Sequence, residues 1–169
     1  MEIERLIVVG AGYVGLVAGT CFASAGFSVG VVEIDAEKLK LLQSGTCPFY
    51  EPGLSEMMKE GIAAGRLEFF SSQESAIKKM DPSFIFCAVG TPENSNGSAN
   101  MSYVERALDD TIKFAQKSVY FILKSTVPVG TGAKLQKICD AKASGKVMIV
   151  NNPEFLREGT AVSDFLRPE

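Results

Sequence analysis

Histidine is absent from this chain of 169 residues. Histidine is the commonest general base near neutral pH and a frequent metal ligand. Any proton transfer must therefore use carboxylates, lysine, cysteine, tyrosine or water, and no metal site is expected.

Cysteine is scarce and widely spaced. The four cysteines match no CxxC metal or redox pattern. Three of them stand in apolar surroundings, which predicts small core residues; these are Cys21, Cys87 and Cys139. Cys47 follows "SGT" and precedes a proline, so we place it in a loop, where a reactive thiol is an open alternative.

An excess of basic charge is also absent. The net charge is −3 and no basic cluster stands out, which argues against nucleic-acid binding. No apolar run reaches the length needed to cross a bilayer, and the start "MEIERLIVVGAG" lacks the basic region and cleavage site of a signal peptide. We therefore expect no membrane partner and a cytoplasmic location.

Short apolar runs alternate with helical patterns along the whole sequence. With 46% hydrophobic residues, the length fits one domain with its own core, which we take as residues 1–169. Expected strands cover 5–10, 28–34, 83–90, 119–125 and 147–151. Expected helices cover 13–26, 35–45, 54–65, 102–117 and 130–143, and the polar stretch 91–102 is expected as a surface loop. This order predicts an α/β fold with a mostly parallel sheet flanked by helices.

A glycine pattern sits between the first expected strand and the first expected helix. In "VVGAGYVG", Gly10, Gly12 and Gly15 have the G-x-G-x-x-G spacing. Gly10 permits the tight turn, Gly12 lets backbone approach a pyrophosphate, and Gly15 allows helix and strand to pack closely. The pattern predicts a Rossmann-type, doubly wound sheet that binds a dinucleotide at a helix N-terminus. A tight turn without a ligand is the alternative.

Glu33 supplies the second half of this fingerprint at the end of the second expected strand. An acidic side chain there can accept both ribose hydroxyls of adenosine and would repel a 2′-phosphate, which favours NAD over NADP. Lys38, nearby in sequence, weakens that exclusion slightly. FAD also binds such folds and remains a rival cofactor.

Four motifs in order resemble those of the UDP-glucose/GDP-mannose dehydrogenase family. They are "GAGYVGL" (10–16), "YEPGL" (50–54), "KSTVPVGT" (124–131) and "NNPEFLREGTA" (151–161), with "VGTP" (89–92) as a weaker fifth. The third and fourth, together and at this separation, are highly specific. "VPVGT" and "REGTA" favour UDP-glucose as the substrate, while GDP-mannose or another UDP-sugar stays open.

The resemblance implies an NAD-dependent oxidation of a sugar-nucleotide C6 alcohol to a carboxylate, in two steps with two NAD⁺ and a cysteine thioester. It implies cofactor contacts for Gly10, Ala11, Gly12, Tyr13, Val14, Gly15, Glu33, Lys38, Val89, Gly90, Thr91, Pro92, Ser125, Thr126 and Glu158. It implies substrate contacts for Glu154, Phe155, Leu156, Arg157 and Glu158. Thr126 would help to position a catalytic water, and Glu154 matches the acid/base glutamate. The family usually has aspartate where this sequence has Glu33, so the resemblance leaves open whether this chain shares the family's cofactor affinity and preference.

Sequence position supports the pairing of Thr126 with Glu154. Each follows an apolar run, so both are expected at C-terminal strand ends, where open α/β sheets bind ligands. Structural alternatives stay open: "KSTVPVGT" as a strand, a proline turn and a helix start, and "NNPEFLREGTA" as a surface loop with Arg157 paired to a glutamate. We interpret "YEPGL" as structural, with Glu51 helping to cap the helix that follows.

The family's nucleophilic cysteine, a catalytic lysine and an asparagine lie further along the chain, on a connecting helix and in a second domain. This sequence ends at "DFLRPE", and none of its four cysteines matches the nucleophile's motif. We therefore expect a fragment that binds NAD but does not oxidise UDP-glucose, from a protein that forms homodimers or larger homo-oligomers. A non-catalytic NAD-binding module is the alternative.

Overall fold

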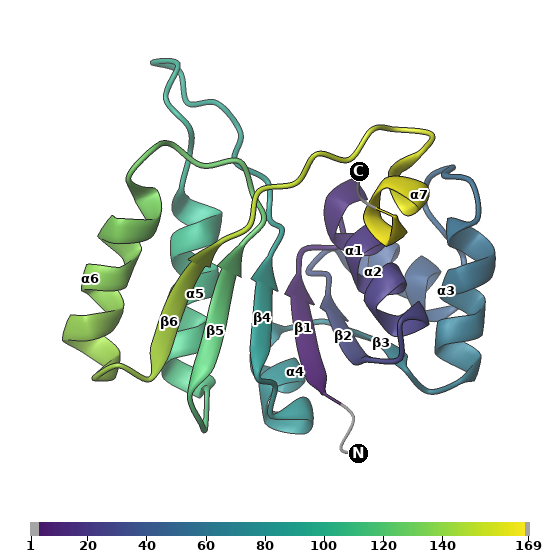
Figure 1. Cartoon of the computed structure of the whole chain (residues 1–169), viewed down its shortest axis with the longest axis horizontal. Coiled ribbons are helices and arrows are strands. Elements are labelled where there is room, and N and C mark those ends of the chain that lie inside the picture. The colour runs from purple at the N-terminus through teal and green to yellow at the C-terminus, as the bar shows by residue number, and fades with distance from the viewer. Residues whose placement is uncertain (1–3, 168–169) are drawn as a thin grey trace.

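Parallel strands form the central sheet of the protein, which a computed structural model describes over residues 4–167 (Figure 1). The strands are β1 (Arg5–Val9), β2 (Ser28–Val32), β3 (Leu67–Phe70), β4 (Phe84–Cys87), β5 (Val119–Leu123) and β6 (Val147–Asn151). Their order is β3-β2-β1-β4-β5-β6, and each neighbouring pair is parallel. The predicted Rossmann-type α/β fold is confirmed.

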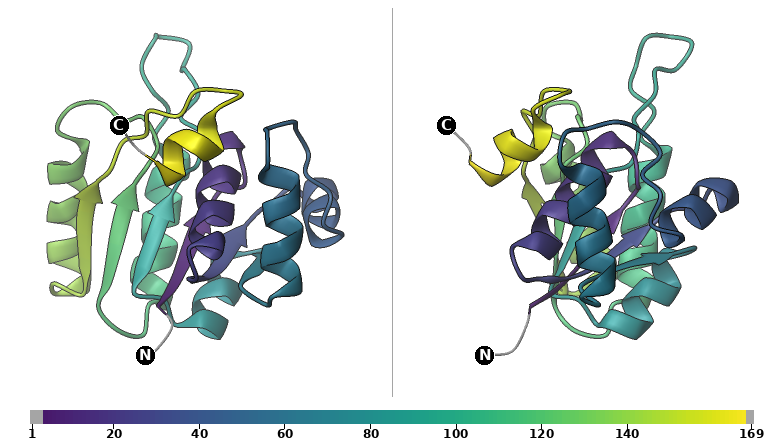
Figure 2. Two further views of the ribbon diagram at one scale, coloured as in Figure 1. Left: turned by 45° about the vertical axis from the view of Figure 1, so that its right-hand side comes forward. Right: turned by 90° about the vertical axis from the view of Figure 1, so that its right-hand side faces the viewer.

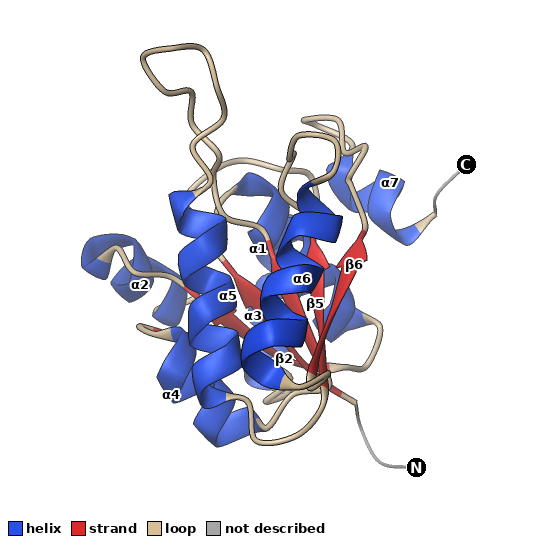
Figure 3. Cartoon of the chain, turned by 90° about the vertical axis from the view of Figure 1, so that its left-hand side faces the viewer, coloured by secondary structure: helices blue, strands red, loops and turns tan. Residues whose placement is uncertain are grey.

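Helices cover both faces of this sheet, as the edge-on view in Figure 3 shows. The helices are α1 (Tyr13–Ser24), α2 (Ala36–Gln43), α3 (Leu54–Ala63), α4 (Gln73–Met80), α5 (Ser102–Phe114), α6 (Thr131–Ala143) and α7 (Ala161–Leu166). One hydrophobic core joins the sheet to α1, α2, α3 and α7, and a second joins it to α4, α5 and α6.

The continuous apolar strands follow from this two-sided burial. On β1, Leu6 and Val8 belong to the first core, whereas Ile7 and Val9 belong to the second. Successive strand residues point to opposite faces, so a strand covered on both sides has no position left for a polar residue.

The chain reverses direction across the sheet at β1. It winds outward from β1 through β2 to β3, then returns to β4 and winds outward to β6 on the other side. Ligands of such sheets bind in the crevice beyond the carboxyl ends of the strands at this reversal. The chain after β6 crosses above those ends to reach α7, which packs on α1 (Figures 1 and 2). We call residues 152–160 the strap.

The structure adds three elements that the sequence did not predict: β3, α4 and α7. β3 is only the four residues "LEFF", and α4 is a polar helix, although Ser72 gives it an N-cap by accepting from the Ser75 amide at 3.2 Å. The expected strand 83–90 was too long, since β4 ends at Cys87 and the following residues leave the sheet. The surface loop 91–102 is confirmed and projects at the top of Figure 1.

The cysteines follow expectation, and α2 has a side-chain N-cap. Asp35 accepts from the Lys38 amide at 2.8 Å and begins α2. The Glu51 carbonyl accepts from the Leu54 amide at 3.1 Å at the start of α3, whereas its side-chain carboxylate bonds the Gly159 amide instead of capping this helix. The three cysteines placed in the core are buried, and burial raises the pKa of the Cys21 thiol to about 12. Within the described residues, no helix combines the length and apolarity that a membrane span requires.

Gly30, in the middle of β2, gives a direct test of the packing. A Cβ built there would lie 2.4 Å from the Met80 sulfur and 2.9 Å from the Phe70 ring. We therefore expect Gly30→Ala to lower the free energy of unfolding by about 1–3 kcal/mol, because overpacking forces both side chains to move. Urea denaturation followed by circular dichroism checks this, and a stability equal to that of the parent would contradict the packing described.

Candidate functional site

The glycine turn joins β1 to α1 at the carboxyl edge of the sheet. Gly10 has φ +99°, and a Cβ on Gly15 would lie 1.9 Å from the Gly10 carbonyl oxygen, so both positions require glycine. Gly12 differs, because a Cβ there would meet nothing within 4 Å. No side chain caps α1 at Gly12, so the first amides of this helix remain available to an anion.

Glu33 follows β2 at the same edge and is 9% exposed. Its Oε1 accepts from the Asp35 amide at 3.0 Å, and its Oε2 lies 2.9 Å from the Lys38 ammonium. Lys38 is thus held against Glu33. These contacts fix the carboxylate at the place where the fingerprint expects a ribose.

A cavity of about 150 Å³ opens beside β1, β2 and β4. Its apolar lining comes from the strand ends, and its polar lining from the β3–α4 turn and from α5. The lining residues include Val9, Val32, Ile34, Val89, Ser71, Ser72, Tyr103 and Arg106. Sequence reasoning missed Ser71, Ser72, Tyr103 and Arg106, because β3 and α4 were not predicted and no motif marks α5.

A second cavity, of about 290 Å³, joins four separate motifs. Its lining residues are Gly12, Tyr13, Val14, Ala88, Val89, Gly90, Thr91, Lys124, Ser125, Thr126 and Glu154. Thr126 and Glu154, expected at two strand ends facing one pocket, therefore line the same cavity as the glycine turn. Their chemical roles stay predictions.

Hydrogen bonds between loops hold the β4 and β5 ends of this cavity together. The Ser125 hydroxyl donates to the Val89 carbonyl at 2.6 Å, and the Thr91 hydroxyl donates to the Thr126 carbonyl at 3.0 Å. Thr126 is exposed at the cavity, whereas the hydroxyl of Ser125 is already engaged. Pro92, which directly follows Thr91, is exposed.

Lys124 is a buried cation in this cavity that sequence reasoning did not single out. It is 7% exposed, and its ammonium donates to Asn152 Oδ1 at 3.1 Å and lies 5.8 Å from the centre of the Phe165 ring. Burial lowers its pKa, while the charge of Glu154 raises it. The available signal was a lysine directly after the apolar run "VYFIL", where a solvated side chain has little room.

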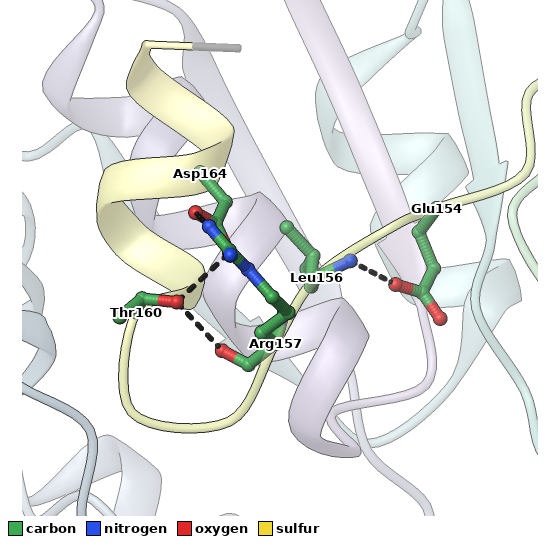
Figure 4. Close-up of polar contacts among 5 residues, drawn as sticks. All are labelled: Glu154, Leu156, Arg157, Thr160 and Asp164. Atoms are coloured by element: carbon green, nitrogen blue, oxygen red, sulfur yellow. Dashed lines mark hydrogen bonds and ion pairs between the residues drawn. The ribbon is translucent and has the colours of Figure 1, made fainter. Parts of the chain in front are cut away.

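The strap carries the expected substrate residues, of which Figure 4 draws Glu154, Leu156 and Arg157. Glu154 Oε2 accepts from the Leu156 amide at 2.6 Å, and this bond fixes the orientation of the carboxylate within the strap. Phe155 is 86% exposed, and Glu158 is also exposed. Leu156 packs against the first core, and its side chain helps to anchor the strap.

Arg157 forms a bidentate ion pair with Asp164 on α7 (Figure 4). Its Nε donates to Asp164 Oδ2 at 3.1 Å, and its Nη2 donates to Asp164 Oδ1 at 2.7 Å. The expected partner in the structural alternative was a glutamate; the partner is an aspartate seven residues later. Hydrogen bonds from the Arg157 guanidinium lower the pKa of Asp164 to about 2. The pair closes the turn between the strap and α7.

Within residues 4–167, no group of three or more cysteine, aspartate or glutamate side chains could hold a metal ion. The site offers the open N-terminus of α1 and the Glu33 carboxylate beyond β2. Beyond β5 and β6 it offers the buried Lys124 ammonium and the Glu154 carboxylate. This set suits a ligand with phosphates and ribose at one end and a reacting centre at the other.

The electrostatic link between Lys124 and Glu154 is open to measurement. We expect Glu154→Gln to lower the pKa of the Lys124 ammonium further, because the carboxylate opposes the effect of burial. NMR titration of the lysine side-chain nitrogen checks this. Glu158→Gln, on the same strap, is the matched control and should leave that pKa unchanged; equal effects of the two variants would contradict the link.

Comparison with known proteins agrees with this geometry. The family model for the NAD binding domain of the UDP-glucose/GDP-mannose dehydrogenase family matches residues 4–169. The chain is 41% identical to a UDP-glucose 6-dehydrogenase of Rhizobium meliloti, over 98% of this chain and 38% of that protein. It is 40% identical to the UDP-glucose 6-dehydrogenase TuaD of Bacillus subtilis, over 98% of this chain and 36% of that protein.

Solved structures give the same result. A UDP-glucose dehydrogenase from Pyrobaculum islandicum superposes with a TM-score of 0.87 at 38% identity, covering 99% of this chain and 39% of that one. A GDP-mannose dehydrogenase from Pseudomonas aeruginosa superposes with a TM-score of 0.88 at 29% identity, covering 98% and 39%. The chain spans less than two fifths of the length of each of these four relatives. It belongs to the UDP-glucose/GDP-mannose dehydrogenase family, whose NAD-binding domain it matches.

Proposed function

We propose that the chain is the NAD-binding half of a UDP-glucose 6-dehydrogenase. The observation that carries this proposal is the cavity that the glycine turn, Thr126 and Glu154 line together. A pure binding module has no need of Thr126 and Glu154. The UDP-glucose 6-dehydrogenases at about 40% identity support the choice of sugar nucleotide.

In this proposal, the adenosine half of NAD⁺ lies toward β2. The amides at the start of α1 bind the pyrophosphate, with Gly12 leaving room for it. Glu33, steadied by Lys38, accepts the ribose hydroxyls, and the cavity beyond Val32 receives the base. Val89 to Pro92 lie along the cofactor beyond β4.

The reacting centre lies beyond β5 and β6. Bound NAD⁺ supplies the acceptor for hydride from C6 of the sugar. Ser125, Thr126 and Glu158 lie toward the nicotinamide, with Thr126 orienting the attacking water. Glu154 exchanges protons with the C6 oxygen and with that water, and its charge acts on the buried Lys124 ammonium.

The substrate contacts come from the strap. Phe155 and Leu156 offer backbone groups to the sugar nucleotide, and Arg157 and Glu158 flank them. The net reaction converts one C6 alcohol and one water into a carboxylate and three protons while two NAD⁺ accept two hydrides. The cysteine that holds the intermediate belongs to the part of the relatives that this chain does not span, so the chain alone should bind NAD⁺ without sustained NADH formation. The intact enzyme is proposed as a homodimer or larger homo-oligomer acting in the cytoplasm.

Calorimetric titration with NAD⁺ tests the cofactor assignment. Glu33→Ala should weaken NAD⁺ binding by about tenfold or more, because hydrogen bonds to a charged group are lost. NADP⁺ should bind the parent more weakly than NAD⁺, since its 2′-phosphate meets Glu33. Glu37→Ala is the control, because Glu37 is exposed on α2 and pairs only with Lys40 among the described residues. Equal affinities of all three proteins for NAD⁺ would contradict the assignment.

Gly12→Ala tests the pyrophosphate position in the same titration. A methyl group at Gly12 meets no protein atom within 4 Å, so the thermal stability should stay near that of the parent. NAD⁺ binding should nevertheless fall at least about tenfold, because the methyl occupies the space of the pyrophosphate. A folded variant that binds NAD⁺ as the parent does would place the phosphates elsewhere.

A further inference from the structure

Glu51 is a buried carboxylate to which the roles above assign nothing. It lies in the loop between α2 and α3 and is 4% exposed. Its Oε2 accepts from the Tyr13 hydroxyl at 2.5 Å and from the Gly159 amide at 2.8 Å. One oxygen thus joins Tyr13, at the glycine turn, to Gly159 at the far end of the strap, which lies 108 residues after Glu51.

The charge on Glu51 is stabilised where it lies. Burial raises its pKa, but hydrogen bonds from Tyr13 and Gly159 and the amides of Val162 and Ala161 outweigh burial, so the pKa falls below its usual value. The other oxygen of Glu51, Oε1, is buried and makes no hydrogen bond within the described residues. The amides of Ala161 and Val162 therefore lower the pKa of Glu51 from nearby, without a short hydrogen bond to it. A buried carboxylate is costly unless it is paired or hydrogen-bonded, and the strap amide is one of its two donors.

Tyr13 responds to the same contact. Burial, the hydrogen bond to Glu51 and the charge of Glu51 raise the pKa of the phenol to about 12. The phenol therefore stays protonated and donates throughout the neutral range. Its ring packs against Phe49, with centroids 5.0 Å apart, which holds the first residue of α1 against the loop that carries Glu51.

The strap is fastened on both sides of Glu154. On one side, Lys124 holds Asn152. On the other, Glu51 holds Gly159, whose φ of +90° lets the chain turn toward α7. Glu154 lies between these two fastenings and lines the cavity that Gly12 and Tyr13 also line.

We infer that Glu51 is a positioning residue of the proposed dehydrogenase site, which sets the distance between the glycine turn and the strap that carries Glu154. The inference rests on the proposed function, since the two parts that Glu51 joins are the proposed cofactor turn and substrate wall. It assigns a role in the site to "YEPGL", a motif that sequence reasoning interpreted as purely structural.

Glu51→Gln keeps the shape of the side chain and removes its charge. The Gly159 amide should then exchange its hydrogen at least about tenfold faster, because charge-assisted hydrogen bonds are about twice as strong as neutral ones. The pKa of Tyr13, followed by NMR of the tyrosine Cζ carbon, should fall below about 12 because one of its causes is gone. The dissociation constant for NAD⁺ should rise roughly three- to tenfold, as expected from the loss of one hydrogen bond that positions the turn.

Arg66→Met is the control. The Arg66 guanidinium donates to the Ala23 carbonyl at 3.0 Å, at the end of α1 away from the glycine turn, and Arg66 lines neither of the two described cavities. This variant should lose stability but keep the Gly159 exchange rate, the Tyr13 titration and the NAD⁺ affinity. A purely structural Glu51 would behave in the same way toward NAD⁺.

The outcomes separate the two claims. Unchanged NAD⁺ affinity in folded Glu51→Gln would overturn the positioning role, even if Gly159 exchanges faster. If Glu51→Gln does not fold, Tyr13→Phe cuts the same link from the α1 side and should weaken NAD⁺ binding to a similar extent; parent-like affinity there would overturn the inference. Failure of the parent chain itself to bind NAD⁺ would overturn the proposed function instead.

Discussion

The contact of Gly15 with the carbonyl of Gly10 sets the geometry on which the rest of the site depends. It brings the start of α1 against the end of β1 more closely than any side chain permits, since a Cβ would lie 1.9 Å from that oxygen. The free amides of α1 consequently open at the sheet edge, beside the ends of β4 and β2. Glu33 and the loop beyond β4 then fall on either side of the same opening.

The strap completes this edge from the other side of the sheet. It leaves β6, crosses the strand ends and reaches α7, which packs on α1 (Figure 2). Two buried charges of opposite sign hold its ends, Lys124 at Asn152 and Glu51 at Gly159. Buried charges specify geometry well because each requires its partner in place. In this account, the chain builds one wall of an active site and fixes it relative to the cofactor turn.

Much of this was predictable from local pattern. Strands buried on both faces appear as continuous apolar runs, and the glycine spacing identifies the turn without a structure. The missed parts have physical reasons. β3 and α4 are short and marginally patterned, so tertiary packing decides them. Lys124 is marked in the sequence only by its place directly after the apolar run "VYFIL", and its contact with Asn152 arises only in the fold. Glu51 meets Gly159 only through the fold, and Arg157 meets Asp164 only because α7 carries Asp164 back toward the strap.

The central claim is that the carboxyl edge of the sheet between β2 and β6 is a dinucleotide site. Backbone amide NMR of the parent chain during titration with NAD⁺ tests it most directly. We expect shifts concentrated in the glycine turn, around Glu33, beyond β4 and at Ser125 and Thr126, with smaller shifts along the strap. Shifts confined to the opposite edge of the sheet, or none at saturating NAD⁺ in a folded protein, would contradict it.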